Sequence, residues 1–190
     1  MTEDNRIGAK LTTLRESLGL TVEELAERTG GDVRLIEGIE AGALVPCLTP
    51  LIKITRALGV RLGTLLDDEE HLGPVVTRGG AAESVTRLKD LATGTVEGTL
   101  DFFSLAHGKS SRHMEPFVIA VNPSAEKSLS SHEGEEFLFV LDGGIEVEYG
   151  KETHTLATGD SIYYDSIVPH QVRAHGDAAA RILAVVYTPV

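Results

Sequence analysis

The chain has 190 residues, with 17 Lys and Arg against 29 Asp and Glu, for a formal net charge of −12. This acidic balance excludes a general electrostatic attraction to nucleic acid or anionic lipid, and residues 1–70 share it, with 8 basic and 13 acidic side chains. A single cysteine, Cys47, excludes an internal disulfide, and its place beside Pro46 favours a small core filler. No apolar run approaches the ~20 residues that span a bilayer, so we expect no membrane role. The first ten residues lack a targeting pattern, which predicts a cytoplasmic protein.

The first two helices are expected before residue 30. The first helix is predicted by apolar residues at intervals of four, three and four, namely Ile7, Leu11, Leu14 and Leu18. It should end near Gly19. Thr21 then predicts the start of a second helix, because its hydroxyl can accept from the first-turn amides while Glu24 reaches back, as in a capping box.

Three further helices complete the helical part. Asp32 is placed to cap a third helix, and Gly42 to end it. The inward positions of this helix should be Val33, Ile36 and Ile39. A fourth helix is predicted by Leu48, Leu51, Ile54 or Thr55, and Leu58, and a short fifth by Leu62, Leu65 and Leu66.

Residues 21–60 resemble the helix-turn-helix of phage-repressor-type, or xenobiotic-response-element, regulators. The resemblance rests on Leu25 and Ala26, the I-x-x-I-E-x-G of Ile36 to Gly42, Pro46, and the run from Leu51 to Val60. It implies that the third helix enters the major groove with Val33, Arg34, Glu37 and Gly38 toward the bases, and that Thr21 lies against a phosphate.

The charge of this third helix leaves a second interpretation open. Arg34 is its only cation, Gly38 offers no side chain, and the following loop, residues 43–46, has no Lys or Arg to hold a phosphate. The alternative is a bundle that keeps the fold but serves dimerisation or substrate capping, because a fold alone does not establish a function.

Beyond a charged, then Gly-rich linker at residues 68–94, the chain changes to a strand period. Eight apolar segments separated by turn residues predict an antiparallel sandwich or small barrel, at residues 99–106, 116–123, 136–143, 145–150, 154–160, 161–169, 170–176 and 181–189. Gly143 and Gly144 indicate one hairpin and Gly150 another. The run FLFVL predicts a strand that is buried on both faces.

Three residues of the strand-rich part suggest a metal site. His132 and Glu136 are four residues apart, so on a strand their side chains point to one side, and His170 can reach them from a neighbouring strand. Two imidazoles and a carboxylate suit Fe(II), Zn, Mn or Ni. The alternative is a hydrogen-bonded polar trio in a barrel without metal.

The same residues resemble the two motifs of the cupin family, read from His132 through Glu136 to Gly143 and then in Gly159–Asp160 and Pro169–His170. The first His of the cupin H-x-H is Ser130 here, and the expected Asn is Ala174. The resemblance therefore implies either an open three-ligand metal site or a member that binds an organic effector instead. Tyr163, Tyr164 and Phe139 should line the core or the ligand pocket, with one tyrosine hydroxyl toward a ligand.

Together, these patterns and the two family resemblances imply a two-domain protein. An all-α, five-helix helix-turn-helix bundle should occupy residues 1–67, and an all-β double-stranded β-helix, the jelly roll of cupins, residues 95–190. The resemblance implies a homodimeric transcription regulator that binds double-stranded DNA and senses a small-molecule effector or a divalent metal.

Two other function classes stay open. The two-part layout and residues 132–143 are also similar to mononuclear non-haem iron epoxidases, which implies a metalloenzyme with the triad His132, Glu136 and His170. The lysine of those enzymes would fall near Gly19 and their substrate-binding tyrosine in residues 100–106, which contain no tyrosine. This favours other oxygen chemistry over epoxidation. A pure binding module is the third possibility.

Overall fold

The computed structural model describes residues 6–66, 73–79, 84–86, 89–90, 100–109, 112–124 and 128–189. The chain divides into two compact units, one of Met1–Asp68 with Thr86–Gly98 and Val190, the other of Glu69–Val85 with Thr99–Pro189. The expected boundaries at residues 67–68 and 94–95 lie outside the described residues.

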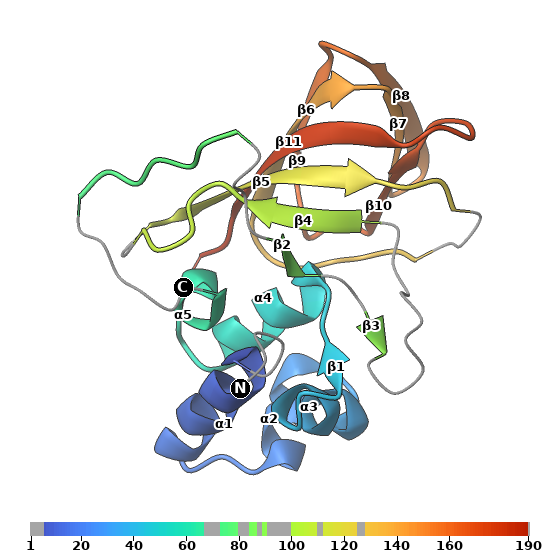
Figure 1. Ribbon diagram of the computed structural model, residues 1–190. Helices are drawn as coiled ribbons and strands as arrows, with labels where there is room; N and C mark the ends of the chain where they lie inside the picture. Colours follow the sequence, from blue (N-terminus) through green and yellow to red (C-terminus); the bar gives the residue numbers. More distant parts are fainter. Residues whose placement is uncertain are drawn as a thin grey trace. The chain divides into compact units, whose positions relative to one another are not determined.

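The first unit contains the five predicted helices, which confirms its fold class (Figure 1). They are α1 (Arg6–Ser17), α2 (Val22–Thr29), α3 (Val33–Glu40), α4 (Leu48–Ala57) and α5 (Leu62–Leu66). The capping box is present, because Thr21 accepts from the Glu24 amide at 3.1 Å and the Glu24 carboxylate accepts from the Thr21 amide at 2.8 Å. Asp32 caps α3 by accepting from the Arg34 amide. Short strands β1 (Leu44–Val45) and β3 (Lys89–Asp90) pair antiparallel, which the sequence did not predict.

Helix α1 lies close against α3. A Cβ on Gly8 would stand 2.2 Å from the Ile39 carbonyl oxygen, so the backbones touch only because this residue has no side chain. Arg15 then joins the two helices through both oxygens of Glu40, at 2.6 and 2.9 Å, and donates to the Leu20 carbonyl. Leu18, expected on the inner face, is 52% exposed and lies just after the end of α1 at Ser17.

The second unit is built of two sheets (Figure 1). All eight predicted segments contain strands, namely β4 (Leu100–Ser104), β5 (Met114–Val121), β6 (Glu135–Asp142), β7 (Gly144–Tyr149), β8 (Glu152–Ala157), β9 (Ser161–Asp165), β10 (His170–Ala174) and β11 (Ala180–Tyr187). With β2 (Ser84–Thr86), they form a six-stranded sheet in the order β2-β4-β5-β11-β6-β9 and a three-stranded sheet in the order β10-β7-β8.

The turn at Gly143–Gly144 is not the predicted hairpin. It carries the chain from β6 in one sheet to β7 in the other, while the hairpin predicted at Gly150 does join β7 to β8. Gly143 has φ +75°, and a Cβ there would lie 3.0 Å from Ala180 Cα, so this crossover also needs glycine.

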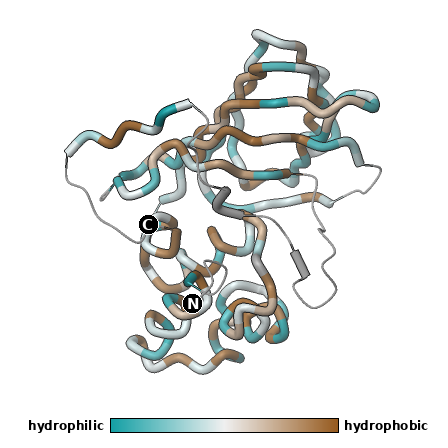
Figure 2. Tube along the Cα trace, in the orientation of Figure 1, coloured by the Kyte–Doolittle hydropathy of each residue, from teal (hydrophilic) through white to brown (hydrophobic). Residues whose placement is uncertain are grey.

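The core of this unit lies between the two sheets. Leu138 and Val140 of β6 face inward with 1% exposure each, whereas Phe137 and Phe139 are only half-buried on the outer face. The strand is therefore alternating, not buried on both faces as FLFVL suggested. Figure 2 shows hydrophobic residues recurring along the helices and the strands. Within the described residues, none of the helices is long and apolar enough to cross a membrane.

Candidate metal centre and helix-turn-helix surface

His132, Glu136 and His170 meet inside the strand-rich unit. Their ligand atoms all lie within 4.8 Å of one another. His132 Nε2 is 2.9 Å from Glu136 Oε1, and His170 Nε2 is 3.3 Å from the same oxygen. Both imidazoles are buried, with side-chain exposures of 3% and 4%. Three donors from two parts of the chain thus converge on one point.

The backbone brings these residues together differently from the expected single strand. His132 precedes β6, and its amide donates to the Ser166 carbonyl, while the Ser166 amide donates to the Gly134 carbonyl. Gly134, at φ +115°, turns the chain between the two ligands. His170 opens β10 in the other sheet, where its amide and carbonyl pair with those of Ser130.

The outer nitrogens of both imidazoles are satisfied by carbonyl groups. His132 Nδ1 is 3.2 Å from the Glu133 oxygen, and His170 Nδ1 is 2.8 Å from the Val168 oxygen. A carbonyl only accepts, so each ring donates from Nδ1 and directs its Nε2 toward Glu136. Each Nε2 can contact the carboxylate favourably either by donating a proton to it or with a metal cation between them. This is the outer-shell arrangement usual for metal-binding histidines.

Hydrogen bonds also orient the Glu136 carboxylate. Tyr164 donates to Oε2 at 2.8 Å and Ser166 donates to Oε1 at 3.1 Å. Burial raises the pKa of Glu136, but hydrogen bonds with His132 and His170 outweigh burial and hold this pKa below its ordinary value. Glu136 is therefore ionised at neutral pH. Burial and the neighbouring carboxylate both raise the pKa of Tyr164, which keeps its hydroxyl protonated as a donor.

The donor set fits a divalent metal. Two imidazole nitrogens and one anionic oxygen are the ligands that Fe(II), Zn, Mn or Ni take from proteins, and three protein ligands leave positions for a small molecule. Ser130, at the place of a fourth cupin ligand, lies with its Oγ 3.0 Å from His170 Nε2. Among the described residues, no other group of His, Cys, Asp and Glu has such convergence.

The expected pocket residues divide between the two faces of the sheet. Tyr164 pairs with Glu136 across β6 and β9 and is 5% exposed on the inner face. Tyr163 is 63% exposed on the outer face, where its hydroxyl donates to Glu135, and Phe139 lies on that same face. Side chains alternate along a strand, so an inner pocket can contain Tyr164 but not Tyr163 or Phe139.

The expected DNA-contacting residues do not form one uniform surface. Arg34 and Glu37 are exposed on α3, and Val33 is half-buried at its start. Gly38 is covered, because a Cβ there would stand 2.5 Å from Leu44 Cδ1, so this glycine admits the loop after α3 and is a poor candidate for base contact. Thr21 is exposed at the start of α2, where its hydroxyl is engaged in the cap.

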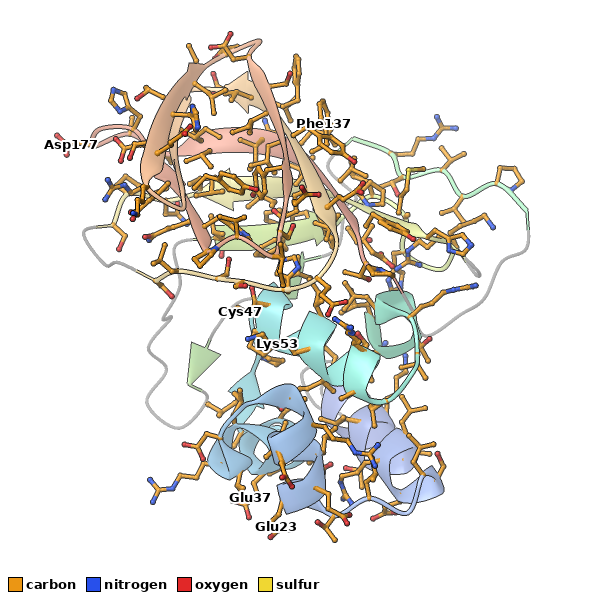
Figure 3. All side chains as sticks on the ribbon, turned by 180° about the vertical axis from the view of Figure 1, so that it is seen from behind. Glu23, Glu37, Cys47, Lys53, Phe137 and Asp177 are labelled. Atoms are coloured by element: carbon orange, nitrogen blue, oxygen red, sulfur yellow. The ribbon has the colours of Figure 1, made fainter. Side chains whose placement is uncertain are left out.

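The surface around α3 carries acidic side chains. Glu23 on α2 and Glu37 on α3 both project outward from the helical unit (Figure 3). The exposed cations of these two helices are Arg28 and Arg34. An anionic DNA backbone would meet few compensating charges here.

Comparison with known proteins assigns both units. A helix-turn-helix domain model matches residues 6–68, and a cupin domain model matches residues 117–186. The chain is 30% identical over 203 residues to (S)-2-hydroxypropylphosphonic acid epoxidase of Streptomyces wedmorensis, covering 96% of this chain and 91% of that protein. The chain belongs to the family of that epoxidase. In this helix-turn-helix and cupin protein, the triad lies in the cupin domain.

Two solved structures share the fold along the whole chain. An HTH_3 family transcriptional regulator from Vibrio cholerae is 21% identical, with a TM-score of 0.70, covering 98% of this chain and 97% of that one. Fe(II) HppE in complex with substrate is 24% identical, with a TM-score of 0.51, covering 98% and 100%. Both establish the two-domain architecture of this helix-turn-helix and cupin protein.

Sequence reasoning missed residues that support the triad. Ser166 was not singled out, although it bonds Glu136 and anchors the backbone of both His132 and Gly134. Ser166 lies in an ordinary turn sequence, which carries no local sign of a role at the triad. Gly134 stood inside the motif itself, and a glycine between two ligands was a usable sign of a turn.

Proposed function

We propose that this protein is a sequence-specific DNA-binding transcriptional regulator whose cupin domain responds to a divalent metal, or to a small molecule bound at that metal. The observation that carries the proposal is the exposed side of α3, where Arg34 and Glu37 are not packed into the helical bundle. In helix-turn-helix proteins, this part of the third helix meets base edges. The metal triad in the cupin domain supplies a second site through which a chemical signal can act.

We expect base contacts to contribute more to binding than phosphate contacts. Arg34 is the only exposed cation of α3, while Glu23 and Glu37 add negative charge nearby. The affinity should therefore fall only slowly with salt, with a log–log slope of about −2 to −4 for a homodimer. Two-fold pairing suits this class of reader, because paired helices must meet half-sites roughly 34 Å apart.

The test is selection of DNA from a random pool by the full chain, with and without Fe(II), Mn(II) or Zn(II). The expected result is enrichment of a two-fold-symmetric sequence. Arg34→Ala should weaken its binding about 10- to 100-fold, as the loss of one base-reading contact does. Lys151→Ala removes the same charge from an exposed cupin turn and serves as the matched control. A pool that stays random under all metal conditions would refute DNA recognition.

The intact triad and the epoxidase relative favour a second candidate, a metal-dependent enzyme with a helical domain that does not bind DNA. A redox-active iron would supply one-electron oxidation chemistry at this site. The chain's own contribution would be to fix the ligand atoms and to keep Glu136 ionised through Tyr164 and Ser166. Oxygen uptake by the iron-loaded protein with small hydroxylated acids, abolished in His132→Ala, would support this candidate. If the protein takes up no oxygen and enriches a DNA sequence, only the regulator proposal stands.

A further inference from the structure

A series of aromatic rings leads from the candidate metal centre toward the surface of the cupin domain. The ring centroids of His170 and Tyr164 are 5.0 Å apart, and those of Tyr164 and Tyr149 are 5.4 Å apart. His132 contacts His170 from the other side, with the two ring centroids 5.6 Å apart. Centroid distances of this size are those of aromatic rings in direct contact. We call Tyr164 and Tyr149 the tyrosine pair.

The two members of the tyrosine pair come from different sheets and differ in burial. Tyr164 lies on β9 of the six-stranded sheet and is 5% exposed. Tyr149 ends β7 of the three-stranded sheet and is only half-buried, and its hydroxyl donates to the Asp165 carbonyl at 3.2 Å. The inner tyrosine is therefore shielded from water, whereas the outer one can exchange protons and electrons with the solvent.

Tyrosines are the side chains of this domain that give up one electron most readily. The chain has no tryptophan, and its single cysteine, Cys47, lies in the helical unit. Tyr164 contacts the triad twice, through its hydrogen bond with Glu136 and through its ring contact with His170. A strong one-electron oxidant formed at the triad would therefore meet Tyr164 before any other tyrosine.

The hydrogen bond of Tyr164 suits the loss of an electron. A phenol that loses one electron becomes a strong acid, so its oxidation is easy only where a base can take the proton. Glu136 Oε2 accepts from the Tyr164 hydroxyl at 2.8 Å, while Glu136 Oε1 lies 2.9 and 3.3 Å from the two imidazoles. The same carboxylate can therefore receive the proton of Tyr164 on one oxygen and contact a metal with the other.

We propose that the tyrosine pair is an electron-transfer route between an iron ion held by the triad and the protein surface. The route removes a strong oxidant from the site when hydrogen peroxide reacts with the iron and no organic substrate is present. The inference rests on the metal-dependent candidate function and is independent of DNA binding. It goes beyond that candidate, because it assigns to Tyr149 a function that metal binding alone does not require.

The electrons and protons of the route balance in two steps. In the first step, hydrogen peroxide and two protons from water accept one electron from Fe(II) and one from Tyr164, which gives Fe(III) and two water molecules. The phenolic proton of Tyr164 moves to Glu136, and a neutral tyrosyl radical remains. In the second step, Tyr149 gives an electron to Tyr164, the proton on Glu136 returns to Tyr164, and the phenolic proton of Tyr149 passes to water.

The test locates the radical on the protein. The full chain is loaded with Fe(II) under argon, its bound iron is measured, and equimolar hydrogen peroxide is added with a nitroso spin trap, which forms covalent adducts with tyrosyl radicals. Tandem mass spectrometry should find more adduct on Tyr149 than on Tyr163, although Tyr163 is 63% exposed and Tyr149 only half-buried. Adduct yields that follow exposure, with Tyr163 labelled more strongly, would indicate a freely diffusing oxidant and overturn the proposal.

Loading with Zn(II) separates the route from the reaction of peroxide in solution. Zinc has no redox chemistry, so the zinc-loaded chain should form no adduct on Tyr149. Equal adduct yields with zinc and with iron would contradict an origin of the radical at the metal.

Tyr149→Phe removes the hydroxyl at the outer end of the route. Electron paramagnetic resonance after rapid freezing should then show a radical that persists longer on Tyr164, and oxidation of the triad histidines should increase. Tyr163→Phe removes the same atom from the outer face of the sheet and should change neither the radical lifetime nor the adduct on Tyr149. A radical that decays equally fast with and without the Tyr149 hydroxyl would reduce Tyr149 to a packing role and refute the route.

Tyr164→Phe interrupts the route at its inner end, and the adduct on Tyr149 should be lost. This variant is compared per bound iron, because the same change should also weaken metal binding. A chain that holds no iron after loading would refute the route together with the metal-dependent candidate. A chain that holds iron but is labelled mainly on Tyr163 would refute the route alone.

Discussion

Gly134 lies so close to the carbonyl oxygen of Tyr187 that a Cβ on this glycine would stand 2.0 Å from the oxygen. The contact joins the turn between His132 and Glu136 to the end of β11. With φ +115° as well, Gly134→Ala should cost more than about 3 kcal/mol of unfolding free energy and weaken metal binding. Thermal unfolding and a metal-indicator titration measure the two effects.

Gly159→Ala is the matched control for that change. Gly159 has φ +94° but nothing within 4 Å of its Cβ position. Gly159→Ala should lower the unfolding free energy by only about 1–2 kcal/mol, which is the cost of the positive φ, and should keep its metal affinity. Equal losses in the two variants would mean that the close approach to Tyr187 is unimportant.

Tyr164 and Tyr163 offer a paired test of how Glu136 is held. Both hydroxyls donate to a carboxylate, but only that of Tyr164 reaches Glu136. Tyr164→Phe should reduce metal affinity about 10- to 100-fold, as loss of an outer-shell bond does, while Tyr163→Phe should leave it unchanged. Isothermal titration with Mn(II) or Zn(II) measures both affinities. Comparable losses from the two substitutions would contradict the orienting role of Tyr164.

Metal binding should weaken as the pH falls. Burial lowers the pKa of His170, but the hydrogen bond with Glu136, the charge of that carboxylate and the hydrogen bond with the Val168 carbonyl together outweigh burial and raise this pKa above the ordinary 6.5. Without metal, protonated His170 therefore stabilises the folded protein. This contribution to the unfolding free energy is fully present below pH 6.5 and is lost as the pH rises through the raised pKa of His170. Metal needs the neutral ring, so its affinity should rise over the same range.

Denaturant titrations from pH 6 to 9 check this dependence. The chelator-treated protein should lose stability with increasing pH, and excess Zn(II) should reverse the trend. His170→Gln should remove most of the pH dependence in both cases. Zinc stabilisation that does not change with pH would exclude His170 as a ligand.

The ion pair between Arg15 and Glu40 should stabilise the helical unit. Both side chains are mostly buried, at 11% and 12% exposure, and Arg15 also bonds the Leu20 carbonyl. Glu40→Ala should therefore cost about 3 kcal/mol, because the guanidinium loses both short contacts with Glu40 and keeps only the longer carboxylate contact, 3.8 Å, with the exposed Glu16. Glu37→Ala, at an exposed position of the same helix, should change the unfolding free energy by less than about 0.5 kcal/mol. Chemical denaturation followed by far-UV circular dichroism compares the two.

The sequence predicted the triad through a partly wrong route. The four-residue interval from His132 to Glu136 was interpreted as two positions of one strand, but β6 begins at Glu135. Convergence arises because Gly134 turns the chain and because Ser130 bonds to the backbone of His170, forty residues away. The spacing of two residues along the chain cannot predict backbone pairing between residues as far apart as Ser130 and His170.

The amino-acid sequence alone determined where the five helices and the eight longer strands occur and where α2 starts, because periodicity and caps such as Thr21 with Glu24 act within a few residues. Tertiary structure decided which face each strand residue occupies. Tyr163 and Tyr164 are adjacent and chemically alike, yet only pairing of β9 with β6 sets Tyr164 inward. Tertiary structure also made Gly143 a crossover between sheets, since a tight turn has the same local sequence whichever strand accepts the next hydrogen bonds.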